Sequence, residues 1–319
     1  MSTLWFAILG LLFATYFALG GLDQGVALLL PLYKGDDAKR GALNAVGPMF
    51  LGNEVWIVGA VGVLIAAFPR LEGELFGAAY PVIVAVVLGL IALNAGVQLR
   101  GRAARRGGFD ALITGGALVL AAGWGLLLGV VLHGVPVDAG GHVHGFAPLA
   151  SPAVWLTALV NVALVMANGA AYLTWRGLRA PSRIGPAAAV LVALAAGAWW
   201  LQDPPDIRNP LLATVLVAVV VAALVLAGST KRAGRAFVAT LVACALPVIA
   251  VALARYPGVL ASTMDPGATV TVDSAAAGGD TLRLLAIGAA PLLPVLVAVQ
   301  ICCWWLFRRR ESQPTPLYW

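Results

Sequence analysis

The chain has 319 residues, of which 61% are hydrophobic and only 11% are charged, and its formal net charge is +6. Soluble domains carry about 25% charged residues, so this composition excludes an ordinary water-soluble protein and indicates a membrane environment. The net charge alone does not indicate nucleic-acid binding, because basic residues also flank membrane-spanning helices.

Nine apolar segments approach or exceed the roughly 20 residues that a helix needs to cross a bilayer. In chain order they cover residues 4–30, 46–68, 75–99, 109–132, 153–174, 186–201, 211–228, 236–254 and 284–307. The first lacks a basic start and a convincing cleavage site, so we expect no removable signal peptide. The pattern predicts an all-α integral membrane protein with about nine transmembrane helices, in which residues 1–319 form a single membrane domain.

Basic residues are concentrated in alternate loops. They follow the odd-numbered segments, at Lys34, Lys39, Arg40, Arg100, Arg102, Arg105, Arg106, Arg176, Arg179, Arg183, Lys231, Arg232, Arg235, Arg308, Arg309 and Arg310. The other loops hold most of the acids, at Glu72, Glu74, Asp138, Asp203, Asp206, Asp265, Asp273 and Asp280. The positive-inside rule therefore predicts that the N-terminus lies outside the cell and the C-terminus in the cytoplasm. Because topology accounts for the charge, we expect no nucleic-acid partner.

Two carboxylic acids, Asp23 and Glu54, fall inside predicted spans, and Asn53 precedes the second of them. An acid at the centre of a membrane helix costs about 2.5–3.5 kcal/mol on insertion scales, so its presence needs a reason. One reading is a proton or ion path, or a buried contact to a catalytic partner. The other is that each acid is satisfied by a neighbouring helix or a buried water.

Other polar residues of the spans include the amides Asn94, Gln98, Asn161, Asn168 and Gln300. Amide side chains can form hydrogen bonds between membrane helices, so we expect these residues to serve packing.

The histidines argue against a haem in this chain. His133, His142 and His144 all fall in the loop between the fourth and fifth segments, and none lies within a span. A membrane haem usually needs His, Met or Cys axial ligands, and no pair of histidines is available inside the membrane. The loop histidines, with Asp138 nearby, could hold a metal, but solvated loop residues are the commoner case and we predict no metal site. The chain also lacks a Walker A loop, a nucleophile elbow and an HExxH motif, so we expect no complete reaction centre here.

Five motifs occur in order along the chain. They are GGLDQGVALLLP (Gly20–Pro31), GPMFLGNEVW (Gly47–Trp56), AAFP (Ala66–Pro69), NGAAYL (Asn168–Leu173) and YPGVLAST (Tyr256–Thr263). This ordered set resembles subunit II of the cytochrome bd-type quinol oxidases. The resemblance spans roughly residues 4–307, and it rests on the NEVW context and the order of the motifs.

The resemblance implies two four-helix bundles plus a peripheral helix. The first bundle would cover about 4–132, the second bundle and the peripheral helix about 153–307, and a short cytoplasmic tail 308–319. It also implies a multi-pass protein of the bacterial plasma membrane, paired with a haem-bearing subunit I that holds haem b, haem d and the quinol site. Small single-span accessory subunits are further partners in such complexes. The complex would oxidise quinol and reduce dioxygen to water, as an oxidoreductase in which this chain is not catalytic alone.

Subunit II in this family supports subunit I, and in some members it also contributes to a proton path, an oxygen route and a bound quinone or lipid. By carry-over, Asp23, Asn53 and Glu54 are the candidates for a polar path. Trp56, which matches the Trp of NEVW, is assigned to the subunit interface or the gas route. No catalytic residue and no metal ligand is assigned to this chain.

The chain departs from the family pattern where the family has acids. These positions are occupied by Gly20, Leu51 and Gln98. A proton path is harder to build from neutral groups than from carboxylates, which leaves open a second hypothesis, a purely structural and assembly subunit. An independent secondary transporter is a third.

Overall fold

The computed structural model describes residues 1–181, 183–201 and 207–307. Nine long helices dominate this part of the chain: α1 (Ser2–Leu29), α2 (Asp36–Ala67), α4 (Tyr80–Arg100), α5 (Gly107–His133), α6 (Pro152–Trp175), α7 (Ile184–Leu201), α8 (Pro210–Ser229), α9 (Ala233–Arg255) and α11 (Gly279–Leu306). Eight of them are long and apolar enough to cross a membrane, and α7 is a shorter apolar helix over Ile184–Trp199. The predicted all-α membrane fold is confirmed. The predicted tail 308–319 lies outside the described residues.

Short elements join the long helices, among them three 3-10 turns at Leu30–Leu32, Ala147–Ala150 and Pro266–Ala268. Helix α3 (Pro69–Ala78) joins α2 to α4, and α10 (Val272–Ala275) precedes α11. Strands β1 (Gly258–Leu260) and β2 (Val270–Thr271) form an antiparallel pair between α9 and α10.

Two predicted boundaries differ from the structure for local reasons. Helix α2 begins at Asp36 and not near residue 46, because two acids in its first turn suit the positive end of the helix dipole and the helix continues past the apolar run. The predicted span 75–99 merges the end of α3 with α4. Pro81 sits in the first turn of α4, where a residue without an N–H starts a helix well, and the chain turns at Ala79.

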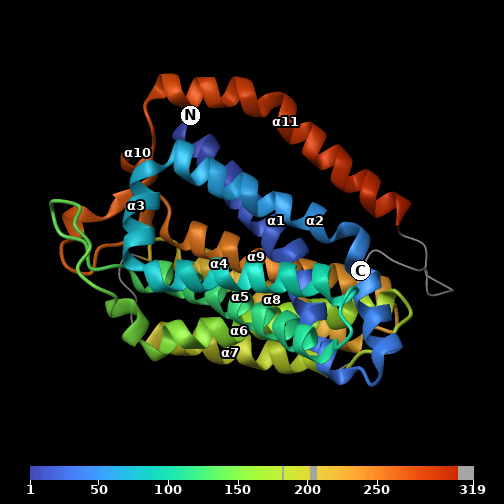
Figure 1. Ribbon diagram of the computed structural model, residues 1–319. Helices are drawn as coiled ribbons and strands as arrows, with labels where there is room; N and C mark the ends of the chain where they lie inside the picture. The colour runs from blue at the N-terminus through green and yellow to red at the C-terminus, as the bar shows by residue number, and fades with distance from the viewer. Residues whose placement is uncertain (182, 202–206, 308–319) are drawn as a thin grey trace.

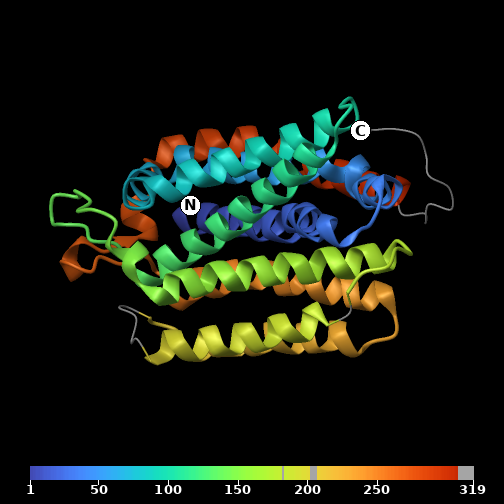
Figure 2. The ribbon, with the colours of Figure 1, turned by 60° about the horizontal axis from the view of Figure 1, so that its bottom comes forward.

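The long helices run along a common axis (Figure 1). Helices α6, α7, α8 and α9 pack in a ring, and α1 packs against α2, α5, α6 and α9. Figure 2 shows α7 and α8 on one side of the molecule and α2, α4 and α11 on the other. Helix α4 packs on α5, while α11 stands apart and packs mainly against α2. The division into two bundles with a peripheral helix stays a prediction.

Glycines let α1 approach α6 until their backbones touch. A Cβ added at Gly25 would lie 1.8 Å from the carbonyl oxygen of Val165, and one at Gly169 would lie 2.4 Å from the carbonyl carbon of Gly25. Small residues at such crossings replace side-chain packing with close backbone contact. This crossing fixes α1, and with it Asp23, against the ring of α6–α9.

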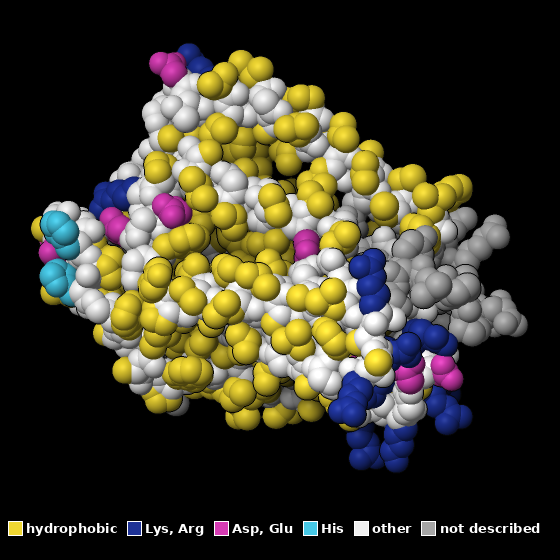
Figure 3. All heavy atoms as spheres, in the orientation of Figure 1, with side chains coloured by type: hydrophobic (Ala, Val, Ile, Leu, Met, Phe, Trp, Pro, Cys, Tyr) yellow, Lys and Arg dark blue, Asp and Glu magenta, His cyan; other side chains and the backbone are white. Residues whose placement is uncertain are grey.

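The two ends of the molecule differ in charge. Figure 3 shows Lys and Arg side chains gathered at one end, hydrophobic side chains along the length, and histidines at the opposite end. The α1–α2, α4–α5, α6–α7 and α8–α9 connections, whose loops carry the basic residues, all lie at the first end, here called the basic end.

At the basic end a cluster of ion pairs joins three helices. The buried Arg100 guanidinium of α4 contacts Asp36 of α2 at 2.8 Å and Asp110 of α5 at 2.6 Å. Lys39 contacts the other oxygen of Asp110 at 2.8 Å, and Arg106 pairs with Asp36. The cluster therefore ties the start of α2 to the α4–α5 connection.

Candidate functional site

The first of the two membrane acids is paired with an amide. Asp23 of α1 is 3% exposed and Asn53 of α2 is fully buried. The Asn53 Nδ2 donates to both carboxylate oxygens of Asp23, at 3.2 and 3.0 Å. Tertiary packing of α1 on α2 thus brings together two of the predicted site residues, 30 positions apart, and satisfies the acid in the protein interior.

The hydrogen bonds continue from Asn53 to the last helix. The Asn53 Oδ1 accepts from Gln300 Nε2 at 3.1 Å, and the Gln300 Oε1 accepts from Trp56 Nε1 at 3.2 Å. Gln300 and Trp56 are both buried. Asp23, Asn53, Gln300 and Trp56, from α1, α2 and α11, form one buried series of hydrogen bonds, here called the polar chain.

The second acid lies elsewhere. Glu54 follows Asn53 in sequence, but neighbouring residues of a helix point about 100° apart. Its carboxylate is only partly buried, and its Oε1 accepts from Asn94 Nδ2 of α4 at 2.6 Å. The same nitrogen of Asn94 also donates to the Leu90 carbonyl at 3.0 Å. Of the three residues predicted for a polar path, Asp23 and Asn53 therefore belong to the polar chain, and Glu54 lies at the contact between α2 and α4.

Gln300 is the site residue whose importance the sequence did not reveal. We expected it to serve packing alone, yet it bonds to two of the four predicted site residues. Its sequence signal was a single glutamine within a long apolar run, which requires a buried partner but does not identify it.

Glu54 borders a surface of apolar side chains. On α2 the neighbouring Leu51 and Val58 are 55% and 70% exposed, and on α4 Leu88 and Ile91 are similarly exposed. A carboxylate at the edge of such a surface would be costly against lipid.

The histidine loop is organised around one carboxylate. Asp138 accepts from the backbone N–H groups of Gly140 and His142, each at 2.9 Å, and its Oδ2 lies 2.8 Å from His144 Nε2. The hydrogen bond with His144, followed by that from the His142 backbone, holds the pKa of Asp138 well below its usual range. Within the described residues, no group of three or more His, Cys, Asp and Glu side chains is arranged to hold a metal ion.

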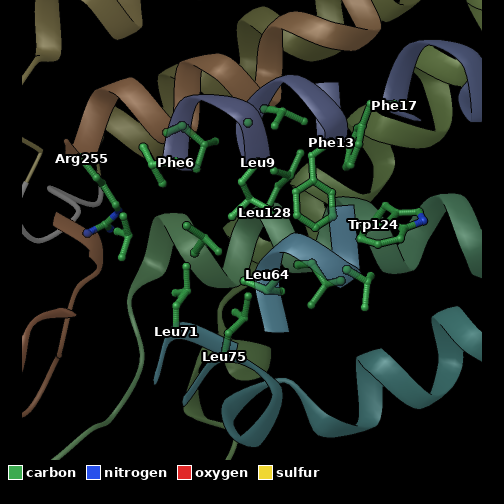
Figure 4. A pocket seen from close by; sticks show the side chains of 18 of the residues that line it. Phe6, Leu9, Phe13, Phe17, Leu64, Leu71, Leu75, Trp124, Leu128 and Arg255 are labelled. Atoms are coloured by element: carbon green, nitrogen blue, oxygen red, sulfur yellow. The ribbon is translucent and has the colours of Figure 1, made fainter. Parts of the chain in front are cut away.

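An apolar cavity of about 160 Å³ lies between α1, α2, α5 and α9. Figure 4 shows the aromatic rings of Phe6, Phe13 and Phe17 from α1 along it, with Trp124 at one end and Arg255 at the other. Its lining is almost entirely hydrophobic, and a cavity of this kind takes apolar molecules in preference to water.

Known proteins match this chain over nearly its whole length. The family described as cytochrome bd terminal oxidase subunit II matches residues 1–307. Cytochrome bd ubiquinol oxidase subunit 2 of Bacillus subtilis (strain 168) is 26% identical over 335 residues, which cover 99% of this chain and 98% of that protein. Cytochrome bd-I ubiquinol oxidase subunit 2 of Escherichia coli (strain K12) is 24% identical, covering 95% of this chain and 93% of the relative.

A solved structure agrees in fold. The bd oxidase from Geobacillus thermodenitrificans contains a chain that matches with a TM-score of 0.75 and 19% sequence identity, covering 96% of this chain and 98% of that one. The family match over residues 1–307 confirms the resemblance inferred from the motifs. The protein belongs to the cytochrome bd terminal oxidase subunit II family, and is subunit II of a bd-type respiratory quinol oxidase.

Proposed function

We propose that this chain is the haem-free subunit of its quinol:dioxygen oxidoreductase and that it supports a haem-bearing subunit I through the face formed by α2 and α4. The observation that carries this proposal is the position of Glu54. A partly buried carboxylate at the edge of an apolar surface favours contact with another protein over contact with lipid. A polar or basic group of subunit I would complete its hydrogen bonding.

The histidines of this chain do not suit haem ligation. His142 and His144 are engaged by Asp138 in a loop outside the spans, and His133, the last residue of α5, contacts the Gly134 carbonyl. The haems b and d are therefore assigned to subunit I. The apolar cavity suits a different kind of occupant, such as dioxygen or part of a quinone or lipid tail, because its lining is nearly free of polar groups.

The proposed orientation follows from charge. With the basic end in the cytoplasm of a bacterial cell, the N-terminus lies outside and the histidine loop faces the outer side of the plasma membrane. Gln300 then lies about 9 Å, or six residues, from the cytoplasmic end of α11 at Leu306. Asp23, six residues before the end of α1 at Leu29, and Gln300 then both lie in the cytoplasmic halves of their helices.

Within the polar chain only Asp23 has an ionisable side chain, since amides and indole do not ionise. The proposed contribution to proton uptake is therefore limited to Asp23, reached through water, and to Glu54 at the subunit contact. The amides favour the alternative role, a structural and assembly subunit without a proton path. The transporter hypothesis has no feature of the site in its favour.

Substitution of the two acids separates the remaining roles. Asp23→Asn and Glu54→Gln keep the size of each side chain and remove its charge. If either acid carries protons, the intact purified complex, with its haem content unchanged, should lose quinol oxidation and coupled proton uptake together. Parental rates in both variants would assign the chain to the structural role, and loss of haem content in Glu54→Gln alone would mark Glu54 as a residue of the subunit contact.

A further inference from the structure

The polar chain has a fixed direction. The indole N–H of Trp56 can only donate a hydrogen bond, so the Gln300 atom that faces it must be the amide oxygen. The Gln300 NH₂ group then faces Asn53, and the Asn53 atom that receives it must also be the oxygen. The Asn53 NH₂ group is left to face Asp23.

The order of donors and acceptors along the polar chain decides which group of Asn53 faces the Asp23 carboxyl. An ionised Asp23 accepts only and would keep the Asn53 NH₂ toward it unaided. A protonated Asp23 has an O–H donor and could turn the two amides around. The donor at the far end prevents that reversal, because a reversed Gln300 would place its NH₂ against the Trp56 N–H. Trp56 and Gln300 therefore hold an N–H donor toward Asp23 in both of its protonation states.

Gln300 also attaches α11 to α2 through its hydrogen bonds with Asn53 and Trp56. Among the described residues of α11, only Leu282 and Gln300 are buried. Near the histidine end, the Leu282 carbonyl accepts from Trp5 Nε1 of α1 at 3.1 Å. At the other end of α11, Trp304 stacks with Trp175 of α6 and Phe237 of α9, and the carbonyl of Phe307, which follows α11, accepts from Arg176. The polar chain is the hydrogen-bonded link between α11 and α2.

We propose that Gln300 is a positioning residue, which uses the donor-only indole of Trp56 to hold the Asn53 amide in the orientation that presents N–H to Asp23. The inference deepens the proposed function, on which it rests. The Gln300 side chain then links the packing of α11 on α2 to the hydrogen bonding of the Asp23 carboxyl. Trp56 acts here as the fixed end of the polar chain, in addition to any contact it makes with a partner.

Isotope-edited infrared spectroscopy of the purified complex tests this directly. With ¹³C in the aspartate carboxyl groups, the band of Asp23 is the one lost in Asp23→Asn, whichever protonation state it has. In Gln300→Met this band should shift, because Asn53 is released. Trp56→Phe should shift it in the same direction, and the double variant should shift it no further than Gln300→Met, since both changes act through one series of bonds.

Two control variants distinguish the positioning role of Gln300 from a general loosening of the packing of α11. Trp5→Phe removes a polar attachment near the start of α11 without touching the polar chain, and Gln98→Met makes the same substitution at an exposed glutamine of α4. Both should leave the Asp23 band in place. An unchanged band in Gln300→Met, additive shifts in the double variant, or an equal shift in Trp5→Phe would overturn the inference.

Failure of the proposed function gives a different result. If no haem-bearing partner purifies with the chain, the proposed function falls. If the complex forms with its haems and the Asp23 band does not shift in Gln300→Met, only the positioning role of Gln300 is refuted.

Discussion

The crossing of α1 and α6 allows a stability prediction worked from distances. In Gly25→Ala the new Cβ would lie 1.8 Å from the Val165 carbonyl oxygen and 2.9 Å from the backbone nitrogen of Gly169, whereas real Cβ contacts essentially never fall below 3.0 Å. The helices must therefore move apart by about 1 Å, and overpacking of this kind typically costs about 1–3 kcal/mol. We expect the upper end, because the obstructing atoms belong to the backbone and cannot rotate away.

The separation would also strain a second contact between the same helices. The Asn168 Nδ2 of α6 donates to the carbonyl oxygen of Ala18 of α1 at 2.8 Å. Heating the purified complex and following the fraction that remains assembled by size-exclusion chromatography should give a lower midpoint for Gly25→Ala. Gly62→Ala is the matched control, since its Cβ would meet nothing within 4 Å. Equal midpoints for Gly25→Ala, Gly62→Ala and the parent would refute the reasoning.

Three further substitutions test other parts of the structure. Arg100→Met removes the buried cation shared by Asp36 and Asp110, which keep Arg106 and Lys39 as partners, and should cost about 1–3 kcal/mol; an undiminished amount of the subunit in membranes, measured by immunoblot, would argue against this. Glu54→Leu should reduce the haem recovered with the chain if a partner covers this side chain, whereas an unchanged yield would indicate contact with lipid. The pKa of Asp138 is lowered in the folded loop, so its stabilising effect is present above the ordinary aspartate pKa and is lost only as the pH falls through the lower folded value. Asp138→Asn should therefore increase hydrogen exchange in the loop over 134–146 at neutral pH, and the difference from the parent should shrink in strong acid; the same difference at every pH would count against it.

The membrane fold could be predicted because the requirement for a span is local. About 20 consecutive apolar residues suffice, and every such run became a long helix in the described part of the chain. The predicted boundaries were wrong where a helix extends beyond an apolar run and where one apolar run is divided between two helices. Half of the first ten residues of α2 are polar or charged, yet the segment is helical, and ion pairs such as Lys39 with Asp110 hold it. The break before α4 depends on one proline, Pro81, within a run that is otherwise continuous in hydropathy.

The candidate site was only partly predictable. The cost of burying an acid marked Asp23 and Glu54 from composition alone. Helix geometry already indicates that the adjacent residues Asn53 and Glu54 point about 100° apart. The sequence does not indicate what each of them meets, because that depends on which helices pack on each side of α2. The contact of Asn53 with Gln300 joins positions 247 apart, and it is set by how α11 lies over α2.

We propose that this chain holds a haem-bearing partner and binds no haem itself. This role is tested most directly by purifying the tagged chain from its native membrane and recording the reduced-minus-oxidised absorbance spectrum. We expect haem bands and a second, larger haem-bearing subunit, together with quinol oxidase activity, and no haem bands when the chain is produced without that subunit. A pure, folded chain that comes from the native membrane alone and without haem, or one that binds haem by itself, would contradict the account.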